Sequence, residues 1–355
     1  MEKYNLNEFL APIWQGNTIY NETGMFYGEE GEISLIYSPD EILSIKDYGI
    51  EKTYVLGKDY LVINGKIKRT KDSSIPFATH DFLYLKNKAS VEIGVEKSRC
   101  PDYVEGYDFI NYSEGSYFTG KQISITYTHS DTFKGSIPLA KSDRFKNFNS
   151  KLKANQPIKI VAYGDSITTG CNASSTVAGG EVPPYCDRFD IMIKKYLERT
   201  YNASIEVRNV AVGGWAVRHG INDFDNRVTK DSADLMILAF GMNDLFTPIE
   251  KYKEQTEQMV LKFKKHNPNG EVVLVATMLP NPESDWYQNQ PLFLKPLLEL
   301  EEKYDYCSVA DLTTIHSDIL GLGKRYRDIT GNNINHPNDF IVRLYAQVIL
   351  KTLIG

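Results

Sequence analysis

Four short segments of the sequence carry residues that together could perform acyl transfer. Ser166, in a Gly-Asp-Ser tripeptide, offers a hydroxyl nucleophile, and His336, in Asn-His-Pro, offers an imidazole base. A serine hydroxyl is a weak nucleophile until a base takes its proton. The oxyanion that follows needs preorganised N–H donors, and the loss of one costs about 3 kcal/mol of barrier. The donors we expect are the backbone N–H groups of Ser166 and Gly214 and the side-chain amide of Asn243.

The elements that must position these residues form an alternating pattern. Apolar runs typical of buried strands alternate with stretches of helical periodicity, which predicts βαβ units and a parallel sheet. In such a sheet the ligand site lies beyond the carboxyl ends of the strands. Three of the segments directly follow a run, and His336 precedes the last helix, so we expect all four on one rim. The runs are 158–163, 205–212, 235–240, 272–277 and 307–312, and the helical stretches are 191–201, 255–265, 292–303 and 340–353.

The four segments resemble the motif blocks of the SGNH (GDSL-type) hydrolase superfamily. Its members carry serine in a GDS block, glycine in a second block, asparagine in GxND and histidine in a late DxxH block. Here these blocks are 164–166, 209–214, 241–244 and His336. A GDS tripeptide alone is weak evidence, but four blocks in order are specific. The resemblance runs from residue 159 to about 353, and it implies a flavodoxin-like α/β fold with esterase or lipase activity and no metal.

One position departs from the family pattern. The family's acid stands three residues before the histidine, where this sequence has Asn333. An asparagine carbonyl can still orient the imidazole, and so can a backbone carbonyl in a Ser–His dyad. We expect one of these two arrangements. Asp328 and Asp339 are the nearby carboxylates that offer the alternative.

Two tryptophans are candidate substrate-binding residues. Trp215 follows the oxyanion glycine, so its indole would wall the acyl pocket, stack on a sugar ring or pack in the core. Trp286 falls in a loop after the fourth apolar run, where it could form a platform for a sugar ring. Asp165 and Asp244 lie beside the candidate catalytic residues, but we expect them to hold the local backbone instead of taking part in the reaction.

Up to about residue 140 the sequence follows a different pattern, of short β-rich segments separated by turn residues, which is typical of a β-sandwich. Among them are 33–37, 60–63 and 123–127. Asn64-Gly65 predicts a type I′ hairpin, because both central residues of that turn need positive φ. A polar stretch over 141–156 places the domain boundary near residue 150. The predicted domains are therefore an N-terminal β-sandwich (1–150) and an SGNH hydrolase domain (151–355).

This arrangement resembles two-domain carbohydrate esterases, in which a β-sandwich of jelly-roll type precedes the SGNH domain. The resemblance implies a substrate class of acetylated plant oligosaccharides, such as acetylated mannan or xylan, from which the enzyme removes acetyl groups. A lipase or thioesterase for longer acyl chains would use the same catalytic blocks. A non-catalytic carbohydrate-binding protein that has kept the fold is the alternative from another class.

Composition argues against several other classes of protein. With 40 Lys and Arg against 46 Asp and Glu, the net charge of -6 provides no basic field for nucleic acid. The apolar run 235–240 is far shorter than the ~18 residues of a spanning helix, so no membrane span is expected. The first residues show no secretory signal, and we expect a cytoplasmic protein. The sequence carries no signal for an oligomeric state.

The cysteines and histidines predict neither a disulfide framework nor a metal site. The four cysteines show no CxxC spacing, which suits a reducing compartment. The histidines other than His336 show no HxH or HExxH spacing, and no cofactor is expected. The cysteines are Cys100, Cys171, Cys186 and Cys307.

Overall fold

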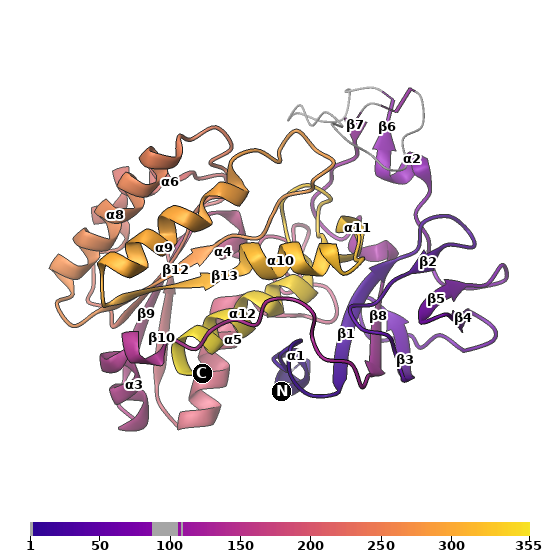
Figure 1. Cartoon of the computed structure of the whole chain (residues 1–355), viewed down its shortest axis with the longest axis horizontal. Helices are drawn as coiled ribbons and strands as arrows, with labels where there is room; N and C mark the ends of the chain where they lie inside the picture. The colour runs from indigo at the N-terminus through magenta and orange to yellow at the C-terminus, as the bar shows by residue number, and fades with distance from the viewer. Residues whose placement is uncertain (1–2, 87–105, 108) are drawn as a thin grey trace.

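The computed structural model describes residues 3–86, 106–107 and 109–355, so Cys100 lies outside the described residues. It has an α/β part built on a parallel sheet, and an N-terminal part built on antiparallel strands beside it (Figure 1). The predicted fold class is confirmed. No helix among the described residues is long and apolar enough to cross a membrane.

The α/β part is built on five parallel strands in the order β10-β9-β11-β12-β13. This is the flavodoxin-like order, in which the strand order reverses beside the first strand and ligands bind in the crevice at that point. All five apolar runs predicted as strands form strands. Their bounds are β9 Ile158–Gly164, β10 Ile205–Asn209, β11 Leu235–Ala239, β12 Glu271–Ala276 and β13 Cys307–Asp311.

Helices cover both faces of this sheet, because successive side chains along each strand point to opposite sides. Along β9, Ile158 and Ile160 join one buried cluster, whereas Val161 and Tyr163 join the other. Helices α3, α5, α10 and α12 supply the first cluster and α6 to α9 the second. The helices of this part are α3 Lys146–Lys153, α4 Ser166–Thr169, α5 Phe189–Tyr201, α6 Val217–Asn222, α7 Phe224–Arg227, α8 Ile249–His266, α9 Leu294–Lys303, α10 Leu312–Gly321, α11 Tyr326–Ile329 and α12 Asp339–Ile354, with short 3-10 turns at η3 Ser142–Arg144 and η4 Gln290–Leu292.

The described residues of the N-terminal part form three antiparallel sheets, in the orders β1-β8-β3, β2-β5-β4 and β6-β7. Strands β4 and β5 form the predicted hairpin, and Asn64 and Gly65 in its turn have φ of 50° and 74°. Of the segment 33–37, predicted as β-rich, Ile33 alone belongs to a strand. The elements are α1 Leu6–Phe9, β1 Thr18–Met25, β2 Glu32–Ile33, β3 Glu41–Asp47, β4 Tyr60–Ile63, β5 Lys66–Arg69, α2 His80–Leu83, β6 Tyr84–Leu85, β7 Phe109–Ile110, η2 Thr119–Lys121 and β8 Gln122–Thr128.

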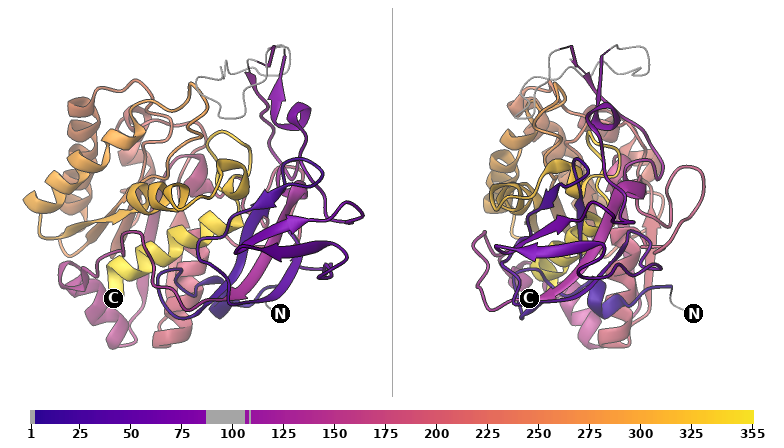
Figure 2. Two further views of the ribbon diagram at one scale, coloured as in Figure 1. Left: turned by 45° about the vertical axis from the view of Figure 1, so that its right-hand side comes forward. Right: turned by 90° about the vertical axis from the view of Figure 1, so that its right-hand side faces the viewer.

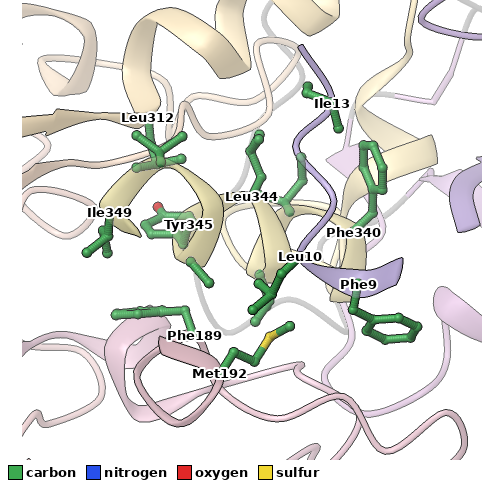
Figure 3. Packing of buried hydrophobic residues seen from close by; sticks show 14 of the residues in the cluster. Phe9, Leu10, Ile13, Phe189, Met192, Leu312, Phe340, Leu344, Tyr345 and Ile349 are labelled. Atoms are coloured by element: carbon green, nitrogen blue, oxygen red, sulfur yellow. The ribbon is translucent and has the colours of Figure 1, made fainter. Parts of the chain in front are cut away.

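Helix α12 of the α/β part also packs against the N-terminal part. Its first turn lies beside the N-terminal strands (Figure 2). Phe9 and Leu10 of the N-terminal segment pack beside Phe340 and Leu344 of α12 (Figure 3). One buried cluster therefore runs through both parts of the chain. The predicted boundary near residue 150 falls within α3, and the division into 1–150 and 151–355 stays a prediction.

Candidate active site

Ser166 begins the short helix α4, directly beyond the carboxyl end of strand β9. Asp165 caps that helix by accepting the backbone N–H of Ile167 at 3.0 Å, as predicted for it. Burial raises the pKa of the Asp165 carboxyl to about 7, although the hydrogen bond from Ile167 acts to lower it. Gly164 allows the close approach of the neighbouring strand, because a Cβ there would lie 2.3 Å from a carbonyl oxygen of β11. The serine is thus fixed by a tightly packed turn.

His336 reaches this serine from the loop that precedes α12. Its Nε2 lies 2.8 Å from Oγ of Ser166, and the two residues are 7% and 5% exposed. The loop is shaped by Asn332, whose Oδ1 accepts the backbone N–H groups of Ile334, Asn335 and His336 at 2.9–3.0 Å. The structure brings Ser166 and His336 together on the rim, at the geometry that a nucleophile and its base require.

The other nitrogen of the imidazole contacts two acceptors. Nδ1 of His336 lies 2.9 Å from Oδ1 of Asn172 and 3.2 Å from the carboxylate of Glu114. The amide nitrogen of Asn172 donates to the carbonyls of Gly115 and Gly331, which turns its oxygen toward His336. Since both neighbours accept, Nδ1 carries the proton and Nε2 accepts the hydroxyl proton of the serine.

Glu114 is held as a charged carboxylate. Its Oε1 accepts hydrogen bonds from the Tyr112 hydroxyl and from the amide of Asn332. Burial alone would raise the pKa of Glu114, but the hydrogen bond and charge of His336, together with these two donors, lower the pKa to about 2. The carboxyl is therefore ionised throughout the neutral range.

Asn333 does not orient the imidazole, so the expectation for this residue is wrong. It has a φ of 70°, and its amide donates to the carbonyl of Asn111 at 3.1 Å. The alternative carboxylates also bond elsewhere. Asp328 accepts the backbone N–H groups of Met25 and Arg325, and Asp339 accepts that of Ser174. In place of the backbone carbonyl of a dyad, the two side chains of Asn172 and Glu114 contact Nδ1.

No sequence pattern indicated Glu114, which stands 222 residues before His336 and belongs to no motif block. Asn172 lies six positions after the serine, outside the blocks, in the turn that follows α4. Its φ of 65° is of the kind that asparagine tolerates better than most residues. That preference suggests a turn at this position, but it does not indicate a contact with the histidine.

The two other predicted oxyanion donors lie on the same rim. Gly214 has a φ of 77°, in the left-handed region that favours glycine, and its backbone faces the cavity beside Ser166. The Asn243 amide donates to the carbonyl of Trp215 at 3.0 Å, which fixes its orientation. Asp244 accepts the N–H of Val217 at the start of α6, so it holds local backbone as predicted.

These residues surround a cavity of about 630 Å³. Trp286 lines it and donates its indole N–H to the carbonyl of Met242. Trp215 is instead half-buried against the second cluster, with the Arg227 guanidinium 4.6 Å from its ring centroid, and it is not among the described residues that line the cavity. The lining is Tyr112, Glu114, Ser166, Cys171, Asn172, Thr176, Ala178, Gly213, Gly214, Asn243, Trp286, Ile334, Asn335 and His336.

Across the described part of the chain, no three His, Cys, Asp or Glu side chains are grouped so that they could hold a metal ion.

Comparison with known families identifies the class of protein. Residues 162–339, half of the chain, match the model of the GDSL-like Lipase/Acylhydrolase family, and the chain belongs to that family. The predicted membership of the SGNH (GDSL-type) hydrolases is confirmed. A search of the curated proteins found no match.

Several solved structures are similar to this chain. A two-domain esterase (CEX) active on acetylated mannans has 22% identity and a TM-score of 0.48, over 62% of this chain and 53% of that one. Axe2, an acetylxylan esterase from Geobacillus stearothermophilus, has 15% identity and a TM-score of 0.46, over 56% and 94%. LAE5, an α/β hydrolase from the metagenome of Lake Arreo, Spain, has 18% identity and a TM-score of 0.44, over 54% and 93%. The match spans about half the length of the first of these.

Proposed function

We propose that this chain is a serine esterase that removes acetyl groups from acetylated oligosaccharides of the plant hemicellulose type. The observation that carries the esterase assignment is the 2.8 Å contact between Ser166 Oγ and His336 Nε2 on the rim of an open cavity. A non-catalytic binding protein would have no need of a nucleophile and a base in hydrogen-bond contact.

The reaction begins when Ser166 gives its hydroxyl proton to Nε2 of His336 as Oγ bonds to the ester carbonyl carbon. The imidazolium then returns the proton to the leaving sugar oxygen, the C–O bond breaks, and an acetyl group remains on Ser166. Water gives a proton to the same nitrogen and attacks the acetyl carbon. Acetic acid leaves as the proton returns to Oγ, which restores the serine, and the acid then ionises to acetate in solution.

The negative charge of each tetrahedral intermediate is held by three N–H donors. These are the backbone N–H groups of Ser166 and Gly214 and the side-chain amide of Asn243. The amide nitrogen carries two protons, and the bond to the Trp215 carbonyl engages one of them. The second is then oriented for the oxyanion without any rearrangement during the reaction, which is what makes such donors effective.

The substrate class is supported by the size and lining of the cavity. Its volume of about 630 Å³ far exceeds an acetyl group and lies in the range of sites for drug-sized ligands. Trp286 and Tyr112 contribute aromatic surface, and Asn335 contributes a polar side chain. Aromatic rings with nearby hydrogen-bonding groups suit a sugar, which has an apolar face and a polar edge.

A longer acyl chain is the second candidate substrate, and the apolar part of the lining favours it. Ile334, Ala178 and Trp286 could pack against methylene groups that an acetyl ester lacks. A lipase or thioesterase of this kind would use the same nucleophile, base and oxyanion donors.

Release of acetate from a panel of native acetylated manno- and xylo-oligosaccharides tests the proposal. We expect release by the wild-type protein and none by Ser166→Ala. Hydrolysis of octanoyl esters without release of acetate from any member of the panel would contradict the substrate class. A protein that hydrolyses no ester of either kind would contradict the esterase assignment itself.

A further inference from the structure

The carboxylate at the histidine comes from the N-terminal part of the chain. Glu114 follows β7 and stands before β8, among the antiparallel sheets, yet it reaches Nδ1 of His336 at 3.2 Å. The family position for an acid, three residues before the histidine, is occupied by Asn333, which faces away. A charged partner is therefore present, but from a different part of the chain.

The two acceptors at Nδ1 differ in what they can do. The amide oxygen of Asn172 is neutral, so it fixes the ring orientation and the tautomer. Glu114 adds a full negative charge beside a ring that becomes positive during each proton transfer. A carboxylate in this position stabilises the imidazolium, which a neutral amide does much less well.

Glu114 is held in place by residues of the loop that precedes α12 and carries His336, here called the histidine loop. Asn332 donates to Glu114 through its amide nitrogen, and its amide oxygen accepts the N–H of His336. One side chain thus sets the carboxylate and the histidine backbone relative to each other. Asn333 adds a second link, because its amide donates to the carbonyl of Asn111, three residues before Glu114.

The N-terminal strands also contact residues before this loop and at its two ends. Lys324 and Glu22 form an ion pair of 2.9 Å between side chains that are both fully buried. Gln122 of β8 donates to the carbonyl of Thr330, and Asn338 donates to the side chains of both Gln122 and Thr23. Removal of one partner of such a pair would leave an uncompensated buried charge, which is strongly destabilising.

We propose that Glu114 is the positioning carboxylate of His336 and that the N-terminal part thereby completes the active site. The inference rests on the proposed function, since the imidazolium arises only if His336 acts as the base. In this arrangement the acid lost at residue 333 is replaced by a side chain from the N-terminal part of the chain. Asn172 remains as the neutral acceptor that fixes the tautomer.

The experiment compares Glu114→Gln with the matched control Glu283→Gln. Glu283 also accepts a tyrosine hydroxyl across the two parts of the chain, from Tyr84 at 2.7 Å, and it does not line the cavity among the described residues. In Glu114→Gln we expect kcat to fall ~10- to 100-fold, the worth of one charge-assisted hydrogen bond, with little change in KM. The control should retain wild-type kcat.

A second measurement does not depend on activity. NMR of protein labelled with ¹⁵N-histidine, with the signal assigned through His336→Gln, follows the ring of His336 as pH changes. Loss of the neighbouring negative charge makes protonation of the ring less favourable, so we expect the titration midpoint to move to lower pH in Glu114→Gln and to stay unchanged in the control.

An unchanged kcat and midpoint in a folded Glu114→Gln would overturn the inference. Equal losses in Glu283→Gln would also overturn it, because they would show a general effect of contact between the two parts. A wild-type protein without esterase activity would contradict the proposed function, and the NMR titration would still decide whether Glu114 is the charged partner of His336.

Discussion

Asn172 and His336 are joined by a contact of 2.9 Å between the amide oxygen and Nδ1, and Glu114 meets the same nitrogen at 3.2 Å. The imidazole therefore has two acceptors where a triad has one. Each of them alone would keep the proton on Nδ1 and leave Nε2 free to accept from Ser166. This redundancy can be measured.

We expect the effects of Asn172→Ala and Glu114→Gln on kcat to be strongly non-additive. Each single variant keeps one strong acceptor at Nδ1, so each loses ~10- to 100-fold at most. The double variant has lost both native acceptors, and its loss should exceed the product of the single losses. Measurement of kcat for the four proteins of this cycle checks the prediction. Simple multiplication of the two effects would mean that the acceptors act independently.

Replacement of Ser166 by alanine should abolish hydrolysis of a short activated ester while the protein stays folded. Removal of the nucleophile of a serine hydrolase costs on the order of 10⁶ in kcat. The thermal unfolding midpoint should change little, since the hydroxyl lies on the cavity rim. Ser130→Ala is the control, because Ser130 is exposed and is not among the described residues that line the cavity. Turnover by a folded Ser166→Ala at the wild-type rate would refute the assignment of the nucleophile.

The amide of Asn243 should stabilise the transition state without contributing to substrate binding in the ground state. Asn243→Ala removes one oxyanion donor, and we expect kcat to fall ~10²- to 10³-fold with KM nearly constant. Asn226→Ala, an exposed asparagine, should have no effect. A change in KM without a change in kcat would assign Asn243 to ground-state binding instead.

Trp286 should matter for large substrates and little for small ones. If its ring forms a platform for a sugar, Trp286→Ala should raise KM for an acetylated oligosaccharide and leave hydrolysis of a simple acetyl ester almost unchanged. Acetyl esters should also be cleaved much faster than octanoyl esters by the wild-type protein. A preference for octanoyl esters, or an equal effect of Trp286→Ala on both acetyl substrates, would favour assignment of the protein as a lipase or thioesterase.

Local sequence patterns predicted those parts of the site that depend on neighbouring residues. The apolar runs defined the five parallel strands, and the rule that ligands bind beyond their carboxyl ends brought Ser166, Gly214 and Asn243 to one rim. The loop before α12 then added His336, at 2.8 Å from the serine. Each of these placements follows from which residue comes directly after a strand or before a helix.

The partners of Nδ1 could not be found in this way. Glu114 meets His336 through contacts across 222 positions of sequence, and no periodicity or motif records which loop of the N-terminal part faces the rim. Trp215 shows the same limit, because its position beside Gly214 fitted both the cavity and the core. In the structure the Trp215 ring packs against the second buried cluster and contacts the Arg227 guanidinium, so it belongs to the core and not to the cavity.

A last prediction concerns Asp339, which is buried at the start of α12. Burial raises the pKa of its carboxyl from 3.8 to about 6, and its Oδ2 has no hydrogen-bond partner in the described structure. The unfolded chain therefore ionises this group at lower pH than the folded protein does. Its ionisation lowers stability as pH rises from about 4 to about 6, and the penalty, up to about 3 kcal/mol, is then constant at neutral pH.

Asp339→Asn removes this ionisation while its Oδ1 can still accept the N–H of Ser174. We therefore expect the variant to be more stable than the wild type at pH 7 and equal to it at or below pH 4. We expect kcat to be unchanged, because in the described structure the Asp339 carboxylate accepts from Ser174 and makes no hydrogen bond to His336. Urea unfolding of both proteins between pH 4 and pH 8 measures the difference. A stability difference that does not change with pH would show that Asp339 ionises alike in the folded and unfolded chains. A large loss of kcat in Asp339→Asn would instead show that Asp339 takes part in catalysis.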